Sequence, residues 1–197
     1  NIFSAIPAER RRPLFVTEFG VRGVPTFEGE AGFQPGAWPD GTPLTQTNTA
    51  AFQHAWFMIR AAQLSYSATV KWDLYAAKYD AGTQDHSAIG PGVEGWPTRP
   101  VLRVLELLTS TTRPRGGRIV DLVPGTSVDP AKLLTAYISP AGNISILGLH
   151  TSGGLTAPTT DAPVPYSIGG LPPNTLFRLL VWNADGSSVL YVEKDPE

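Results

Sequence analysis

The segment Phe15-Val16-Thr17-Glu18-Phe19-Gly20 belongs to a short apolar run that starts at Leu14, directly after Pro13, and is closed by Gly20. An apolar run bounded by such residues is typical of a buried β-strand. Its single charged residue, Glu18, stands near the C-terminal end of the strand. A carboxylate in this place is costly unless it has polar partners or a chemical task. The pattern leaves two interpretations open: a functional carboxylate, or a side chain that only reaches solvent or an arginine.

An alternation of strands and helices continues downstream. Thr47 or Asn48 can cap a helix that runs to about Leu64, with apolar residues three and four positions apart. The run from Ala68 to Tyr75 predicts a second buried strand, and Pro97 is expected to start a second helix. Strand, helix, strand, helix is the repeat of a parallel sheet with crossover helices.

A long connection follows each of the two predicted strands, and the first, Val21 to Thr45, is rich in glycine and proline. β/α barrels carry their active-site loops at this end of the strands. A complete barrel needs eight β/α units and typically ~250 residues, and only two units are recognisable here. We expect the other units upstream of Asn1; a smaller fold is the alternative.

From about Gly117 the sequence changes to short β-rich runs separated by turn signals. This pattern predicts a small antiparallel β-sandwich. The fold class expected for the chain is therefore α/β plus all-β, with barrel units in residues 1–115 and a sandwich module in residues 116–197. The predicted β runs are 118–123, 133–138, 143–150, 176–183 and 189–193.

Composition excludes several classes of function. The chain of 197 residues has a formal net charge of -2, and its short basic clusters indicate solvated loops, not a nucleic-acid surface. It contains no cysteine, so neither a disulfide nor a thiolate metal site is possible. With three scattered histidines, we expect no metal and no cofactor. No run approaches the ~20 apolar residues of a membrane span, so we expect no membrane partner.

Two strand motifs resemble those of the clan A glycoside hydrolases. Phe15 to Gly20 resembles the seventh strand of that barrel, where Thr-Glu-Phe/Tyr-Gly holds the catalytic nucleophile. Val70-Lys71-Trp72-Asp73 resembles the eighth strand, which ends in a tryptophan that floors a sugar subsite. The resemblance covers about residues 10 to 112 and implies strands seven and eight of a (β/α)8 barrel, with Glu18 as nucleophile. For Trp72, core packing is the alternative to sugar stacking.

The resemblance also implies a retaining mechanism, in which two carboxyl groups about 5–5.5 Å apart share the work. The acid/base glutamate of this clan follows an asparagine at the end of strand four. No Asn-Glu pair occurs in this sequence. We therefore expect the acid/base residue upstream, and we expect this chain alone to be inactive.

Other aromatic and polar residues of the two long connections are candidates for substrate contact. Trp38 and His86 are predicted to bind the carbohydrate, whereas Trp96 is either a further subsite or a packing anchor beside a helix start. The expected partners are a poly- or oligosaccharide and the rest of the barrel, and the expected location is secreted or periplasmic. The alternatives are a non-catalytic carbohydrate-binding protein and a structural subunit that complements a partner chain.

Overall fold

The computed structural model describes residues 5–10, 12–20, 46–64, 66–71, 74–75, 87–90, 92–112, 117–120, 132–150, 176–182 and 188–194. The chain divides into two compact units, Asn1–Thr156 and Ala157–Glu197. Each unit is described by itself. The domain boundary expected at residue 115 stays a prediction, and the first compact unit extends beyond it.

The first unit begins with a parallel β–α–β arrangement. Strand β1 (Phe15–Phe19) pairs in parallel with β2 (Ala68–Lys71), and helix α1 (Asn48–Gln63) lies between them in the sequence. The two strands start together, because the Ser67 N–H donates to the Leu14 carbonyl over 2.7 Å. The parallel pairing expected from the sequence is therefore present in the described residues.

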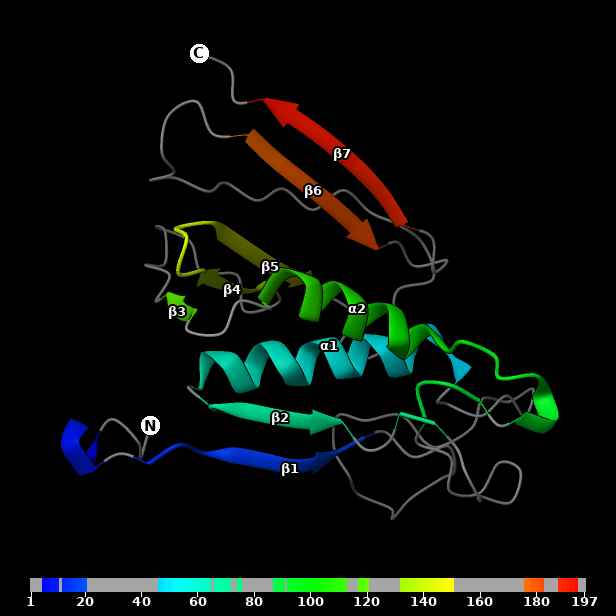
Figure 1. Cartoon of the computed structure of the whole chain (residues 1–197), viewed down its shortest axis with the longest axis horizontal. Helices are drawn as coiled ribbons and strands as arrows, with labels where there is room; N and C mark the ends of the chain where they lie inside the picture. Colours follow the sequence, from blue (N-terminus) through cyan, green and yellow to red (C-terminus); the bar gives the residue numbers. More distant parts are fainter. Residues whose placement is uncertain are drawn as a thin grey trace. The chain divides into compact units, whose positions relative to one another are not determined.

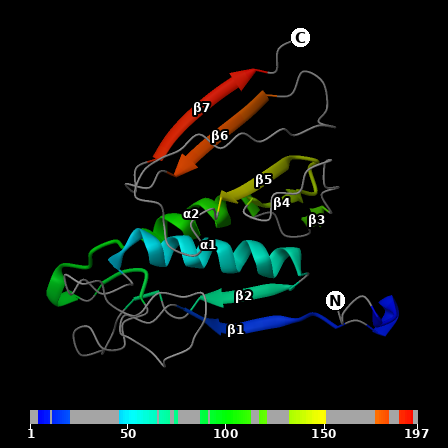
Figure 2. The same cartoon turned by 180° about the vertical axis from the view of Figure 1, so that it is seen from behind.

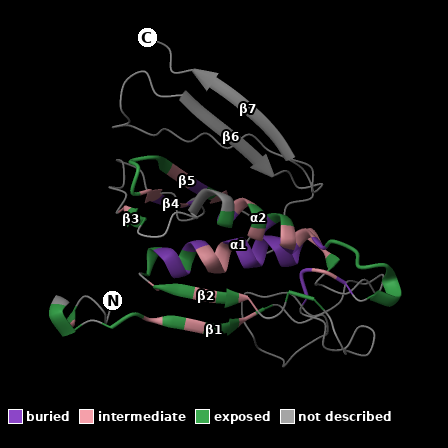
Figure 3. Ribbon diagram, in the orientation of Figure 1, coloured by how far each residue is buried: buried purple, intermediate pink, exposed green. Residues whose placement is uncertain are grey.

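Helix α1 is the most deeply buried element of the described chain (Figure 3). Its N-cap is Thr47, whose hydroxyl accepts a hydrogen bond from the Ala50 N–H, as the sequence predicts. From Thr49 to Ala55 every residue is buried, so this part of the helix is enclosed on all sides. A helix surrounded in this way belongs to the centre of a fold, not to its surface.

Helix α2 (Pro100–Thr112) starts three residues later than predicted. A helix that began at Pro97 would include Pro100, which lacks the N–H that bonds back to residue 96, and it would force Arg99 into helical angles that a residue before proline avoids. Pro97 instead lies in extended chain, and its carbonyl accepts from the Gly90 N–H over 2.8 Å. Val101, Val104 and Leu108 form the buried stripe of α2.

A three-stranded antiparallel sheet completes the first unit. It has the order β3 (Arg118–Val120), β4 (Lys132–Ile138) and β5 (Ile144–His150). Helix α1 contacts β4 and β5, and α2 contacts β5. Figures 1 and 2 show the two helices between this sheet and the β1–β2 pair. The Gln63 side chain donates from Nε2 to the Leu134 carbonyl over 2.7 Å and so ties the end of α1 to β4.

The second unit contains an antiparallel pair, β6 (Leu176–Trp182) and β7 (Ser188–Lys194). Their register runs without interruption from Leu176 opposite Lys194 to Trp182 opposite Ser188. Strands thus form at all five predicted β runs, and every described pairing among them is antiparallel. The sandwich arrangement itself stays a prediction.

The expected burial of β1 and β2 is wrong for the described residues. Phe15 in β1 is 56% exposed, and Val70 in β2 is 52% exposed. Parallel strands are normally covered on both faces. Here the pair is two strands wide, so apolar side chains outside the face packed on α1 stay in contact with solvent. A sheet of two strands gains much of its stability from the helix packed against it.

We predict that residues 1–156 fold as a cooperative unit and that residues 1–115 do not. The shorter chain loses β4 and β5, which cover α1 and α2, and so exposes apolar surface that the longer chain buries. Thermal unfolding followed by circular dichroism, with analytical ultracentrifugation, compares the two. A monomeric 1–115 chain that melts in one transition at the same temperature as 1–156 would contradict this.

Candidate functional site

Glu18 lies at an irregularity of the β1–β2 pairing, next to the C-terminal end of β1. Val16 opposes Thr69, yet Phe19 opposes Lys71, so β1 contains one residue more than β2 over this interval. Thr17 and Glu18 are both exposed, which breaks the inside–outside alternation of a regular strand. A bulge of this kind re-aims side chains and occurs often beside active sites. It turns the Glu18 side chain toward solvent.

Phe19 fixes the end of β1 against helix α1. Its ring stacks on Phe57 with centroids 4.6 Å apart and lies against the His54 ring at 5.6 Å. His54 is buried, and its Nδ1 lies 2.6 Å from the Ala50 carbonyl, to which it must donate a proton because a carbonyl only accepts. The residue after Glu18 is therefore anchored in the core, while Glu18 itself is exposed.

Glu18 is the only predicted site residue that lies within the described part of the chain. Trp38, Trp72 and His86 lie outside the described residues, and their roles stay predictions. Within the described ranges, no group of three His, Asp or Glu side chains could hold a metal ion. No helix in the same ranges is long and apolar enough to cross a bilayer.

Beyond β2, the chain forms a hydrogen-bonded turn that sequence reasoning did not foresee. The Ala88 and Ile89 N–H groups both donate to the Leu74 carbonyl. Ile89 then bridges to Tyr75 in parallel and to Thr98 in antiparallel orientation. Ser87 and Ala88 are fully buried, so this segment is anchored in the core.

Residues 92–96, which we call the Trp96 turn, lie between the paired segments 88–90 and 97–99. They include the short helix η4 (Gly92–Glu94), and the Gly95 N–H donates to the Gly92 carbonyl. Gly95 and Trp96 both have left-handed backbone angles, with φ of 81° and 57°. Glycine accepts this conformation freely, but a tryptophan in it costs roughly 1–2 kcal/mol.

The Trp96 side chain is held in place but exposed. A Cβ built on Gly92 would lie 2.9 Å from Cζ2 of the indole, so the ring lies directly over that glycine. The Tyr75 ring meets it edge-on with centroids 5.9 Å apart. Even so, Trp96 is 54% exposed and Tyr75 is 49% exposed. In the sequence, the exposed Trp96 is marked only by its place between a glycine and a proline. This pattern alone does not distinguish a saccharide subsite from a packing anchor.

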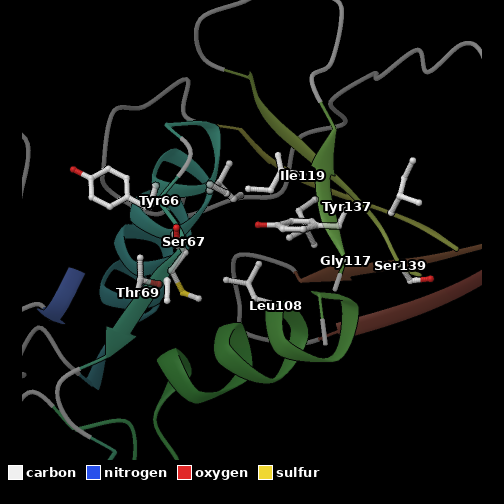
Figure 4. Close-up of a pocket in the computed structure, with 15 residues that line it drawn as sticks. Tyr66, Ser67, Thr69, Leu108, Gly117, Ile119, Tyr137 and Ser139 are labelled. Carbon is white, nitrogen blue, oxygen red and sulfur yellow. The ribbon is translucent and has the colours of Figure 1, made fainter. Parts of the chain in front are cut away.

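A separate cavity of about 550 Å³ lies in the first unit, between α1, α2 and the β3–β5 sheet (Figure 4). Its wall includes Ser67 and Thr69 at the start of β2, whereas Glu18 lies near the C-terminal end of β1. The cavity is therefore distinct from the Glu18 site. Figure 4 shows Tyr137 extending into it from β4, and burial raises the pKa of this hydroxyl above its ordinary value of 10.0.

In comparisons with known proteins, no family model, no curated protein and no solved structure matches this chain.

We expect Tyr137 to make the fold sensitive to alkaline pH. Its pKa is higher in the folded than in the unfolded chain, so its neutral form stabilises the fold fully below about pH 10, and this contribution is lost as pH rises through the folded-state pKa. Tyr137→Phe cannot ionise and should lose less stability between about pH 9 and pH 11. Urea unfolding at both pH values measures this, with pH 7 as control. Equal losses in the two proteins would contradict it.

Proposed function

We propose that this chain is the C-terminal part of a retaining clan A glycoside hydrolase that cleaves O-glycosidic bonds of a poly- or oligosaccharide. In this proposal β1 and β2 are the seventh and eighth strands of a (β/α)8 barrel, and residues 116–197 are an appended β-sandwich module. Glu18 is the nucleophile. The observation that carries the proposal is an exposed carboxylate on a bulge, at the end of a parallel strand whose next residue is anchored on a core helix.

The geometry around Glu18 suits a nucleophile for two reasons. A catalytic carboxylate must reach the substrate, and the bulge leaves Glu18 exposed. It must also be held in one orientation, because small displacements of a reacting group cost rate. The stacking of Phe19 on Phe57 fixes the adjacent backbone from the opposite side. Access and rigidity are thus supplied by neighbouring residues of one strand.

The chemistry then follows the two-step retaining route. The Glu18 carboxylate attacks the anomeric carbon as the bond to the leaving oxygen breaks, and a second carboxylic acid protonates that oxygen. The resulting glycosyl ester is hydrolysed by water, which gives up its proton to the same second group. Because no Asn-Glu pair occurs in the 197 residues, the proposal takes this group from the preceding barrel strands, which also form the walls of the site.

A second candidate function is non-catalytic binding of carbohydrate, or a structural role beside a partner chain. The observation in its favour is the exposed aromatic pair Tyr75 and Trp96, which needs no carboxylate to act. The hydrolase and the non-catalytic binding protein both bind a glycan, whereas the structural subunit does not. A secreted or periplasmic location belongs to the same proposal.

We predict that the 197 residues alone do not hydrolyse 4-nitrophenyl glycosides, whereas the polypeptide extended upstream by the preceding strands does so with retained anomeric configuration. In that longer protein Glu18→Ala should lower kcat by roughly 10⁴- to 10⁶-fold, the scale seen when a nucleophile is removed. Azide added to the variant should restore turnover and give a glycosyl azide of the opposite configuration, because the anion occupies the space of the carboxylate. Proton NMR of the product reads the configuration.

The control is Glu9→Gln, which removes an exposed carboxylate of the short helix η2 (Ala8–Arg10). This variant should keep the wild-type rate. A Glu18→Ala protein that hydrolyses as fast as wild type would exclude Glu18 as nucleophile. Loss of activity without rescue by azide would indicate that Glu18 acts on folding or binding instead.

A further inference from the structure

The exposure of Trp96 needs an explanation, because much of this side chain does not pack against the rest of the protein. Trp96 is 54% exposed, although a tryptophan normally buries most of its surface. A packing anchor at a helix start would be covered. Helix α2 moreover starts at Pro100, four residues after Trp96, so the indole does not lie at a helix start. The alternative of a packing anchor is therefore not supported.

The indole is also fixed before anything binds to it. The left-handed angles of Gly95 and Trp96 set its direction, and Gly92 lies beneath the ring. The two arms of the turn are joined by the hydrogen bond from Gly90 to Pro97 and by the pairing of Ile89 with Thr98. A ring ordered in advance loses little conformational freedom on binding. Strained backbone that persists in this way is common at ligand sites.

Tyr75 adds a second ring to the same surface. The two rings meet at an interplanar angle of 64°, and each residue keeps about half of its surface exposed. Together they form an amphipathic surface with an indole N–H and a phenol hydroxyl at its rim. Flat apolar faces bordered by hydroxyl groups, as in a pyranose ring, match such a surface. Nucleobases also stack on such rings, but nucleic-acid sites normally add basic side chains that contact phosphate, and residues 92–96 contain no Lys or Arg.

The aromatic pair lies at the same end of the strands as Glu18. Phe19 opposes Lys71, and Tyr75 follows Lys71 by four residues in the sequence. Four residues span at most roughly 14 Å, so the Tyr75 backbone lies within that distance of Lys71, the position opposite the residue after Glu18. Figures 1 and 2 show both arrowheads pointing toward the segment that contains η4. A chain of several linked sugars can contact both places.

We infer that Tyr75 and Trp96 form a glycan-binding subsite in which a pyranose ring of the bound saccharide stacks on the indole. The inference rests on the glycan named in the proposed function, but not on catalysis. Trp96 supplies the stacking face and Tyr75 holds its edge. The subsite lies beyond β2, away from the bond that Glu18 would attack, so it holds a distal part of an extended saccharide.

Titration of the 197-residue protein with soluble hexasaccharides tests this subsite. The probes are β-1,4-glucose, β-1,3-glucose, β-1,4-xylose and β-1,4-mannose hexamers at millimolar concentration. ¹H–¹⁵N NMR follows the indole N–H signals, and the one lost in Trp96→Phe identifies Trp96. We expect that signal to shift saturably with at least one probe. Calorimetry should show binding about tenfold weaker for Trp96→Ala and within about threefold of wild type for Trp96→Phe.

Val93→Ala is the matched control, because Val93 is 95% exposed on the same turn but has no ring. It should bind like wild type. Thermal unfolding shows whether each variant is folded. A Trp96 signal unmoved by all four probes, or unchanged affinity in a folded Trp96→Ala protein, would overturn the inference. If Trp96 binds saccharide and the longer polypeptide does not hydrolyse one, the subsite stands and the proposed catalysis fails.

Discussion

The burial of α1 on every side through its N-terminal half is the constraint on which the rest of the first unit depends. The helix accommodates this with small residues, since Ala50 and Ala51 are fully buried and allow close approach of its neighbours. One neighbour is β1, which contacts α1 through Phe19, and another is the antiparallel sheet, which Gln63 meets through the Leu134 carbonyl. The β1–β2 pair and the antiparallel sheet thus both pack against α1. Each of them needs α1 to bury its apolar side chains.

This arrangement explains why the chemical groups collect at one end of the strands. The core packing of Phe19 and the burial of Ser87 fix two backbone points. The carboxylate of Glu18, immediately before Phe19, is exposed to solvent, and so is the indole of Trp96 in the turn after Ser87. In the proposed function the carboxylate forms the bond to the sugar, and the aromatic ring positions the saccharide.

Local sequence patterns predict the helices and strands, whereas the burial of side chains depends on tertiary contacts. The α1 cap at Thr47 and the β runs were readable because they depend on neighbouring residues. The predicted start of α2 is wrong, because Pro97 and Pro100 can each be the first residue of a helix. Only the pairing of residues 97–99 with 88–90 decides between them. Burial of β1 could not be foreseen, since it depends on how many layers cover the sheet. Glu18 was identified by resemblance, while its bulge and the exposure of Trp96 are visible only in three dimensions.

The hydrogen bond from Gln63 to Leu134 has an evolutionary consequence. Appended β modules are often regarded as interchangeable pieces that recombination can swap between catalytic domains. Here the three-stranded sheet shares one compact unit with the helices, and α1 and α2 contact it directly. A crossover near residue 115 would place α1 and α2 against a foreign surface and remove the Leu134 carbonyl that accepts from the Gln63 amide. Inheritance of residues 1–156 is therefore expected to be linked, with freer exchange only downstream of Thr156.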